Sequence, residues 1–226
     1  MDSLILWDID GTILNSQRPP GKSLHCQALS NLGLPVNEPK FKTPGVTDSE
    51  ILSKILEQEG IEYDLALLRE SLESLDRESE RIDPESKFEI CPGILGFFKS
   101  ETARRFTHGI LTGNTPKRTM SKLGAVDLVD TFNSNFLFTC GVGENRQQIA
   151  AKAKAGIDFR KFHSIIVIGD TPADIEVART LNAYSVAVAS GKFNLDELAK
   201  LKPDLTVSNF LENSHLIMNF LKLRLN

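Results

Sequence analysis

Two aspartates, Asp8 and Asp10, directly follow the apolar run from Leu4 to Trp7. A short apolar run of this kind predicts a buried strand, and open α/β sheets bind ligands in the crevice at the carboxyl ends of their strands. Carboxylates at that position can attack a substrate, carry a proton or hold a hard cation. A calcium loop is a poor alternative, because the twelfth residue counted from Asp8 is Pro19 rather than a glutamate.

A second pair of aspartates, Asp170 and Asp174, follows another apolar run from Ile165 to Ile168. An aspartate at position 174, in the first turn of a helix, is favoured by the helix dipole whatever its function. Asp170 has a weaker structural explanation, because a carboxylate that closes an apolar strand costs desolvation energy unless a metal or hydrogen bonds compensate for it. Oxygen ligands from this pair would suit a hard cation.

The third signal is the segment of Thr112, Gly113 and Asn114, which lies between the apolar run from Thr107 to Leu111 and a helix start at Pro116. A hydroxyl group and backbone N–H groups at the N-terminus of a helix can cradle a phosphate. The same residues also make an ordinary helix cap, so the segment by itself leaves both interpretations open.

Short apolar runs alternate with stretches of helical length and period, which predicts an α/β fold with a doubly wound parallel sheet and crossover helices. The continuous apolarity of the runs fits strands that are buried on both faces. The expected strands are residues 4–7, 107–111, 165–168, 184–189 and 205–207, with a weaker one at 136–138. The expected helices are residues 116–123, 145–155, 174–181, 195–201 and 211–223.

The segment of residues 18–87 interrupts this alternation, because it contains helical patterns and almost no strand-like run. Its apolar helical faces fall around residues 24–32, 51–56 and 65–75. Thr47–Glu50 has the sequence of a capping box, which predicts the start of the second helix. Pro19-Pro20 and residues 83–93 predict linkers. We therefore expect an α/β core of residues 1–17 and 88–226, interrupted by a helical cap of residues 18–87.

Together these motifs resemble those of the haloacid dehalogenase-like phosphohydrolases over essentially the whole chain. The first motif of that family corresponds to Asp8-x-Asp10-Gly11-Thr12, the second to Thr112, and the last to Gly169-Asp170-x-x-x-Asp174. The helical insertion between the first two motifs is similar to the cap of the phosphoglycolate phosphatase-like branch. The resemblance implies a Rossmann-like, haloacid dehalogenase-like sheet with an inserted α-helical cap domain.

The remaining motif of that family is a cation, usually a lysine, ahead of the strand that leads to the last motif. Arg146 lies 24 residues before Asp170 and opens an expected helix, so it is the first candidate for this role, with Lys152 as the second. A guanidinium can hold a phosphate through two hydrogen bonds and stays charged, which makes the exchange of lysine for arginine compatible with phosphate binding. A solvated helix arginine is the alternative interpretation.

The resemblance implies a Mg²⁺-dependent phosphatase acting on a small phosphorylated metabolite, with phosphoglycolate suggested by the branch. Asp8 would form an aspartyl-phosphate, and Asp10 would act as the general acid and base. The phosphate would be held by Thr112, Arg146 and backbone N–H groups of Gly113 and Asn114. The metal ligands would be Asp8, the backbone carbonyl of Asp10, Asp170 and Asp174. The cap would close over the substrate and exclude water.

The composition limits the partners of the chain. Its 226 residues include 26 Lys and Arg and 30 Asp and Glu, a net charge of −4 without basic runs, which argues against nucleic acid or a membrane surface as a partner. No segment approaches the roughly 18 apolar residues of a membrane span. Three widely spaced cysteines predict buried thiols in a reducing compartment, so we expect a cytoplasmic protein, either a monomer or a homodimer.

Two other functions share parts of this pattern. A phosphomutase acting on a sugar phosphate would have the same carboxylates but would need a second phosphate site. The insertion shows no clear cationic cluster for such a site, although Arg18, Lys22, Lys40 and Lys42 leave this function open. A phosphorylation-regulated receiver-like module would also combine an acidic cluster with a doubly wound sheet, but the inserted cap counts against it. His25 could contact a substrate from the cap, although a solvated position is the preferred interpretation.

Overall fold

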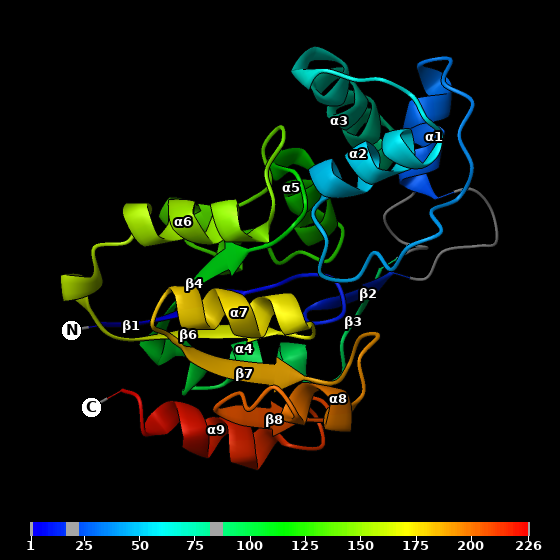
Figure 1. Ribbon diagram of the computed structural model, residues 1–226. Coiled ribbons are helices and arrows are strands. Elements are labelled where there is room, and N and C mark those ends of the chain that lie inside the picture. The colour runs from blue at the N-terminus through cyan, green and yellow to red at the C-terminus, as the bar shows by residue number, and fades with distance from the viewer. Residues whose placement is uncertain (1, 17–22, 82–87, 226) are drawn as a thin grey trace.

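A six-stranded parallel sheet forms the centre of the computed structural model, which describes residues 2–16, 23–81 and 88–225 (Figure 1). The strands lie in the order β5-β4-β1-β6-β7-β8, and all neighbours are parallel. Their bounds are β1 Asp2–Trp7, β4 Phe106–Leu111, β5 Leu137–Phe138, β6 Phe162–Gly169, β7 Tyr184–Val188 and β8 Leu205–Val207. The chain proceeds outward from β1 in both directions, which confirms the predicted doubly wound α/β fold.

Helices cover both faces of this sheet (Figure 1). Helices α6 (Arg146–Gly156) and α7 (Pro172–Thr180) pack on one face, and α4 (Ile94–Lys99) and α9 (Ser214–Lys222) pack on the other. In the described part of the sheet domain, the other α-helices are α5 (Pro116–Gly124), which follows β4, and α8 (Leu195–Ala199), which follows β7. The sheet is thus the middle of three layers, as expected from the alternation of strands and helices.

The side chains of β1 show why its sequence is continuously apolar. Ile5 and Trp7 belong to the apolar cluster on the α4 and α9 side, whereas Leu4 and Leu6 belong to the cluster on the α6 and α7 side. Because successive side chains of a strand point to opposite faces, a strand that is covered on both faces needs apolar residues at every position.

The structure contains elements that the apolar patterns did not predict. β2 (Leu14–Ser16) and β3 (Phe88–Ile90) pair as an antiparallel ribbon, and α4 begins at Ile94. The linker predicted for residues 83–93 is therefore wrong at residues 88–90, because three-residue strands are too short to show a period. The predicted domain boundaries at residues 17/18 and 87/88, together with Pro19-Pro20, lie outside the described residues.

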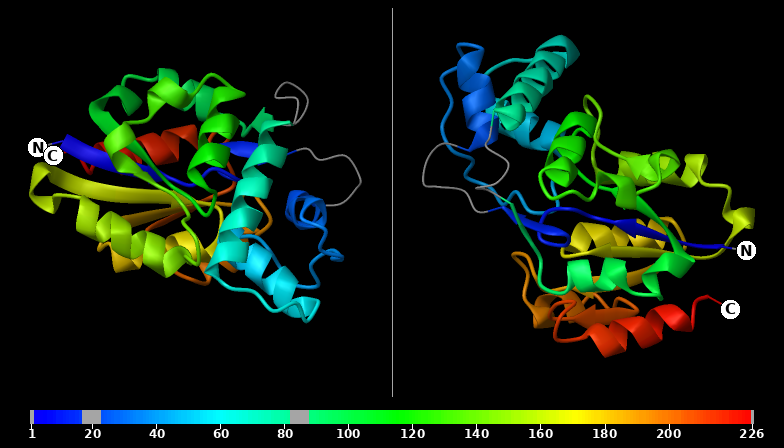
Figure 2. Two further views of the ribbon diagram at one scale, coloured as in Figure 1. Left: turned by 90° about the horizontal axis from the view of Figure 1, so that it is seen from above. Right: turned by 180° about the vertical axis from the view of Figure 1, so that it is seen from behind.

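Three helices between β2 and β3 pack against one another, and we call them the three-helix unit. They are α1 (Leu24–Asn31), α2 (Asp48–Gln58) and α3 (Leu65–Glu80). They enclose an apolar cluster of their own, which includes Leu52, Ile55 and Leu75. The capping box predicted at the start of α2 is present, with Thr47 as the N-cap and Glu50 as its partner. The unit lies at the end of the molecule away from the first residues of β1 (Figure 2).

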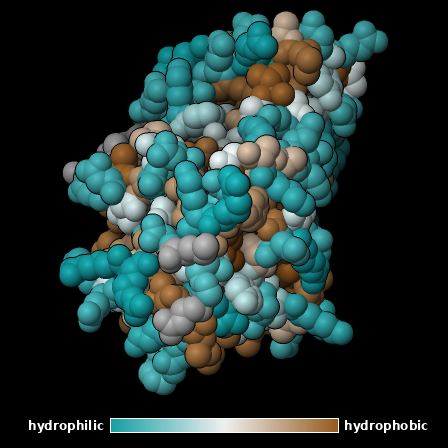
Figure 3. Space-filling view, turned by 90° about the vertical axis from the view of Figure 1, so that its left-hand side faces the viewer, coloured by the Kyte–Doolittle hydropathy of each residue, from teal (hydrophilic) through white to brown (hydrophobic). Residues whose placement is uncertain are grey.

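Hydrophilic residues cover most of the face shown in Figure 3, and hydrophobic residues are visible between them in small areas. Within the described part of the chain, no helix is both long enough and apolar enough to cross a membrane. The three cysteines, Cys26, Cys91 and Cys140, are buried free thiols, as predicted.

His108 on β4 is a buried histidine beside Trp7. Its Nδ1 accepts a hydrogen bond from Trp7 Nε1 at 3.1 Å, and its Nε2 bonds to the carbonyl oxygen of Ala103 at 3.0 Å. These partners require a neutral ring with its proton on Nε2. Burial lowers the pKa of His108 from its ordinary value of 6.5 to about 4, although the bond to Ala103 opposes this shift.

The buried imidazole predicts a pH-dependent stability. The unfolded chain takes up a proton near pH 6.5 and the folded chain only near pH 4, so the free energy of unfolding should fall as the pH decreases through this range. Between pH 7 and pH 5 we expect this group to cost about 2 kcal/mol. Urea unfolding of the wild type and His108→Gln at both pH values measures the effect, because other titrating groups cancel in the difference. An identical difference at both pH values would contradict the prediction.

Candidate active site

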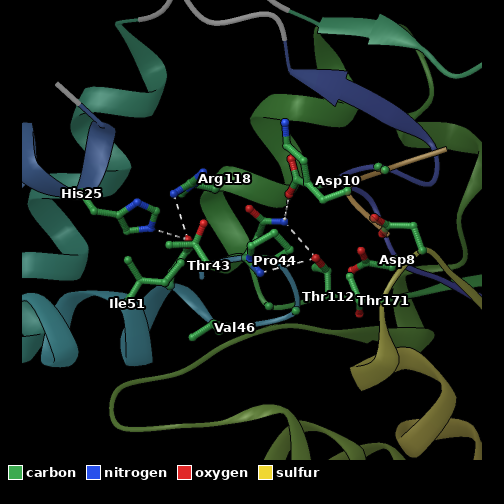
Figure 4. A pocket seen from close by; sticks show the side chains of 18 of the residues that line it. Asp8, Asp10, His25, Thr43, Pro44, Val46, Ile51, Thr112, Arg118 and Thr171 are labelled. Atoms are coloured by element: carbon green, nitrogen blue, oxygen red, sulfur yellow. Dashed lines mark hydrogen bonds and ion pairs between the residues drawn. The ribbon is translucent and has the colours of Figure 1, made fainter. Parts of the chain in front are cut away.

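The carboxyl ends of β1, β4 and β6 face the three-helix unit around a cavity of about 530 Å³ (Figure 4). The segments that follow these strands contribute Asp8, Thr112 and Asp170 to the wall, and the three-helix unit contributes His25 and Ile51. Because the three strands are parallel neighbours, segments that lie far apart in the sequence arrive at the same edge of the sheet. The predicted motifs therefore meet at this cavity.

Asp8, Asp170 and Asp174 form a buried acidic cluster in which one carboxylate oxygen from each lies within 4.8 Å of the others. Burial raises the pKa of Asp8 to about 7, and the neighbouring Asp174 adds to the rise. Burial also raises the pKa of Asp170 to about 9, and the charge of Asp8 adds to it. Buried carboxylates repel one another unless positive charge lies between them, and an all-oxygen ligand set is what Mg²⁺ prefers. The cluster therefore fits a divalent cation.

Gly11 allows the first motif to pass close to the last one. Its φ angle is +84°, and a Cβ atom at this position would collide with the carboxylate of Asp170. Next to it, Thr12 donates a hydrogen bond from Oγ1 to Asp170 Oδ1 at 3.3 Å. The glycine is thus required by a close approach between two segments of the acidic site.

Arg146 is the cation that lies against the acidic cluster. It is the first residue of α6, and a capping box fixes the start of that helix. Its buried guanidinium forms ion pairs with Asp8, at 3.4 Å between Nη1 and Oδ1, and with Asp174. Lys152 instead pairs with Glu144, and 46% of its side chain is exposed. Of the two candidate cations, the structure places Arg146 in the site and Lys152 outside it.

The segment of Thr112, Gly113 and Asn114 lines the cavity, as expected. The side chain of Asn114 connects two other polar groups, because its Nδ2 donates to Thr112 Oγ1 at 2.8 Å and to Asp10 Oδ2 at 2.7 Å. The carbonyl oxygen of Gly113 accepts a hydrogen bond from the backbone N–H of Asp48 at 2.9 Å. Asn114 thus acts through its side chain, whereas only its backbone is considered in the sequence-based prediction.

Lys122 is a site residue that the motifs did not reveal. Its Nζ lies 2.7 and 2.6 Å from the two carboxylate oxygens of Asp10 and 2.7 Å from Asn114 Oδ1. Burial raises the pKa of Asp10, but the charge and hydrogen bonds of Lys122 outweigh it and hold this pKa below its ordinary value. Arg118 and Lys122 are one helical turn apart in the helix that follows Thr112, and this spacing is the signal that could identify them.

Asp48, the first residue of α2, connects the three-helix unit to the sheet domain. Its carboxylate bonds to His25 Nε2 and Arg118 Nη1, both at 2.9 Å, and to the backbone N–H of Thr115 at 3.0 Å. Burial raises the pKa of Asp48, but Arg118 and His25 outweigh it and hold this pKa well below its usual range. The prediction that His25 is solvated is wrong, because local spacing does not reveal a partner on another helix. In Figure 4, His25 and Arg118 lie at the end of the cavity away from Asp8.

Two comparisons at the level of sequence bear on the family of this chain. The sequence pattern of the haloacid dehalogenase-like hydrolases matches residues 5–188. No curated protein matches the chain significantly. The matched segment contains the acidic cluster, Arg146 and the three-helix unit, so it spans both the sheet and the insertion.

Solved structures share the fold at low sequence identity. A haloacid dehalogenase-like family hydrolase from Streptococcus pneumoniae has a TM-score of 0.61 and 16% identity, covering 96% of this chain and 98% of that one. A predicted phosphoglycolate phosphatase from Haemophilus somnus has a TM-score of 0.63 and 18% identity, covering 95% and 97%. A β-phosphoglucomutase from Clostridium difficile has a TM-score of 0.66 and 19% identity, covering 100% and 98%. Because the family pattern matches residues 5–188, most of the sequence, the chain belongs to the haloacid dehalogenase-like hydrolase family.

Proposed function

We propose that the protein is a Mg²⁺-dependent phosphatase that hydrolyses a small phosphomonoester through an aspartyl-phosphate on Asp8. The observation that carries this proposal is the buried cluster of Asp8, Asp170 and Asp174 with Arg146 against it. Phosphoryl transfer to a carboxylate needs a positioned nucleophile and fixed positive charge around the transferred group. The cluster combines both at one edge of the sheet.

In the proposed reaction, a carboxylate oxygen of Asp8 attacks the phosphorus atom, and the bond between phosphorus and the leaving oxygen breaks. Asp10 gives its proton to that oxygen, so that an alcohol leaves. Asp10, now a carboxylate, takes a proton from the water molecule that attacks the aspartyl-phosphate. Inorganic phosphate and the free carboxylate of Asp8 are then restored.

The groups around Asp8 would support these steps. Mg²⁺ would be held by Asp8, Asp170, Asp174 and the backbone carbonyl of Asp10, and when bound it would offset the negative charge of the phosphoryl group. The guanidinium of Arg146 and the hydroxyl of Thr112 would hold phosphoryl oxygens, together with the backbone N–H groups of Gly113 and Asn114. The ion pair between Arg146 and Asp8 supports this role, because it places the guanidinium beside the attacking carboxylate.

The three-helix unit would serve as the cap of this site, with the sheet domain formed by residues 1–17 and 88–226. Two hydrogen bonds support this role by joining the start of α2 to loops of the sheet domain. The backbone N–H of Asp48 donates to the carbonyl oxygen of Gly113 at 2.9 Å, and Thr47 Oγ1 donates to the carbonyl oxygen of Glu144 at 2.6 Å. A cavity of about 530 Å³ between these parts suits a small metabolite.

The experiment is phosphate release from a panel of small esters, including phosphoglycolate, sugar phosphates and nucleoside monophosphates, with Mg²⁺ and after treatment with EDTA. We expect selective release that needs the metal. Asp170→Asn should raise the Mg²⁺ concentration required for half-maximal activity about tenfold or more, since it removes a charged ligand. Glu176 is an exposed carboxylate on α7, so Glu176→Gln is the matched control and should leave this concentration unchanged. Release that persists in EDTA, or no release from any ester, would refute the proposal.

A phosphomutase is the second candidate, because one of the similar structures is a β-phosphoglucomutase. Such an enzyme would need cations for a second phosphate. Lys40 and Lys42 are exposed and are not among the residues that line the cavity, while Arg18 and Lys22 lie outside the described residues. The cations that the sequence offered for this role thus give it no support, so we propose hydrolysis, and isomerisation of a sugar phosphate without phosphate release would reverse this choice. The receiver-like alternative does not fit a chain of a hydrolase family.

A further inference from the structure

Lys122 is a buried cation that bonds to the proposed proton carrier. Its Nζ donates to both carboxylate oxygens of Asp10, at 2.7 and 2.6 Å, and to Asn114 Oδ1 at 2.7 Å. Only 6% of its side chain is exposed. Lys117, on the same helix, is exposed in the way that is usual for lysine. Lys122 therefore points inward because of its position on the helix, and the other lysine of this helix, Lys117, does not.

Burying this ammonium group costs free energy that the fold alone does not require. An apolar side chain could fill the same volume without the desolvation cost. The reason for a lysine at position 122 is therefore sought in its effect on Asp10.

Asp10 needs bonds that fix its orientation, because 45% of its side chain is exposed. Figure 4 shows Asp10 beside the cavity, above Thr112. A carboxylate with this much freedom can rotate unless both of its oxygens are bonded. Lys122 contacts both oxygens, and Asn114 Nδ2 donates to Oδ2 at 2.7 Å. Asn114 is itself held by Lys122 and by Thr112, so the groups form a closed network.

We propose that Lys122 is a positioning residue that fixes the carboxylate of Asp10 in the orientation that delivers a proton to the leaving oxygen. This inference rests on the proposed function, because the orientation of Asp10 matters only if Asp10 transfers protons. Lys122 lines the cavity, and in this proposal it acts through its bonds to Asp10 and Asn114. Replacing Lys122 should therefore lower kcat/KM most for esters whose leaving group needs a proton.

The test compares two leaving groups in Lys122→Met. One ester is the alkyl phosphate that the panel identifies as the best substrate, and the other is 4-nitrophenyl phosphate, whose phenolate leaves without protonation. The ratio kcat/KM reports the steps up to alcohol release. We expect kcat/KM to fall about 10²-fold for the alkyl ester and only a few-fold for the nitrophenyl ester. An equal fall for both esters would overturn the proposal, because it would indicate a role in phosphate binding or folding.

Three further variants make the result specific. Lys117→Met, the matched change on the exposed side of α5, should leave both kcat/KM values unchanged. Lys122→Arg keeps the charge and should recover part of the alkyl-ester activity. In an Asp10→Asn background, Lys122→Met should cause no further loss, because its partner is already changed. An additive loss in that double variant would overturn the proposal, and the double variant also avoids leaving an unpaired carboxylate.

The failure of this inference can be told apart from the failure of the proposed function. If the wild-type protein releases phosphate from no ester, the proposed function fails, and the positioning role fails with it. If the wild type is active and Lys122→Met behaves like Lys117→Met, only the positioning role is refuted.

Discussion

Asp8→Asn is expected to abolish phosphate release from every ester that the wild-type protein hydrolyses. Asp8 is the carboxylate that belongs to the acidic cluster and also pairs with Arg146. An asparagine amide is a far weaker nucleophile than a carboxylate, so the proposed aspartyl-phosphate cannot form. We expect kcat to fall on the order of 10⁴-fold or more, the scale of loss when a covalent nucleophile is removed. The measurement is phosphate release at saturating ester and Mg²⁺.

The same variant should remain folded, which separates chemistry from stability. Burial and the neighbouring Asp174 raise the pKa of Asp8 to about 7, so its negative charge is unfavourable in the folded protein. A neutral amide removes this repulsion, and the thermal unfolding temperature should not fall. Asp10→Asn is the second comparison, because it keeps the nucleophile and should accumulate a phosphorylated chain visible by mass spectrometry. Normal turnover by Asp8→Asn would refute the mechanism.

The central strands could be predicted from local patterns, because a strand covered on both faces needs an unbroken apolar run. Residues 165–168 are such a run. β6 itself is longer, Phe162–Gly169, and the apolar pattern misses its start because His163 is exposed and interrupts the run. β2 could not be predicted in this way. Its residues, Leu14–Ser16, pair with Phe88–Ile90 on the far side of the insertion, so nothing in the local sequence marks them as a strand.

The acidic part of the site could also be found in the sequence, because Asp8 and Asp170 each follow a strand and parallel neighbours carry them to one edge. Lys122 and His25 come from helices instead. Lys122 lies 112 residues from Asp10, and His25 contacts an acid on a different helix. Whether such a side chain faces solvent or a partner depends on how helices pack, which local spacing does not determine.

Arg146→Ala is expected to weaken phosphate binding far more than Lys152→Ala. Arg146 is buried and paired with Asp8 and Asp174, whereas Lys152 is half-exposed and paired with Glu144. Loss of a buried donor that would contact the phosphoryl oxygens should lower kcat/KM about 10²- to 10³-fold. Loss of an exposed ion pair is worth at most about 1 kcal/mol. Competitive inhibition by inorganic phosphate measures the binding directly, and its constant should rise only in Arg146→Ala.

Arg146→Lys separates the charge from the shape of the side chain. A lysine keeps the positive charge but lacks the planar fork with which the guanidinium reaches both Asp8 and Asp174, so its activity should lie between those of the wild type and Arg146→Ala. Arg146 and Lys152 both lie in α6, so each alanine variant removes one cation from the same helix. The two variants therefore differ chiefly in the direction of the side chain that is lost. A larger effect of Lys152→Ala than of Arg146→Ala would contradict this prediction. Lys152 Nζ bonds to the carbonyl oxygen of Thr139 at 3.0 Å, away from the acidic cluster.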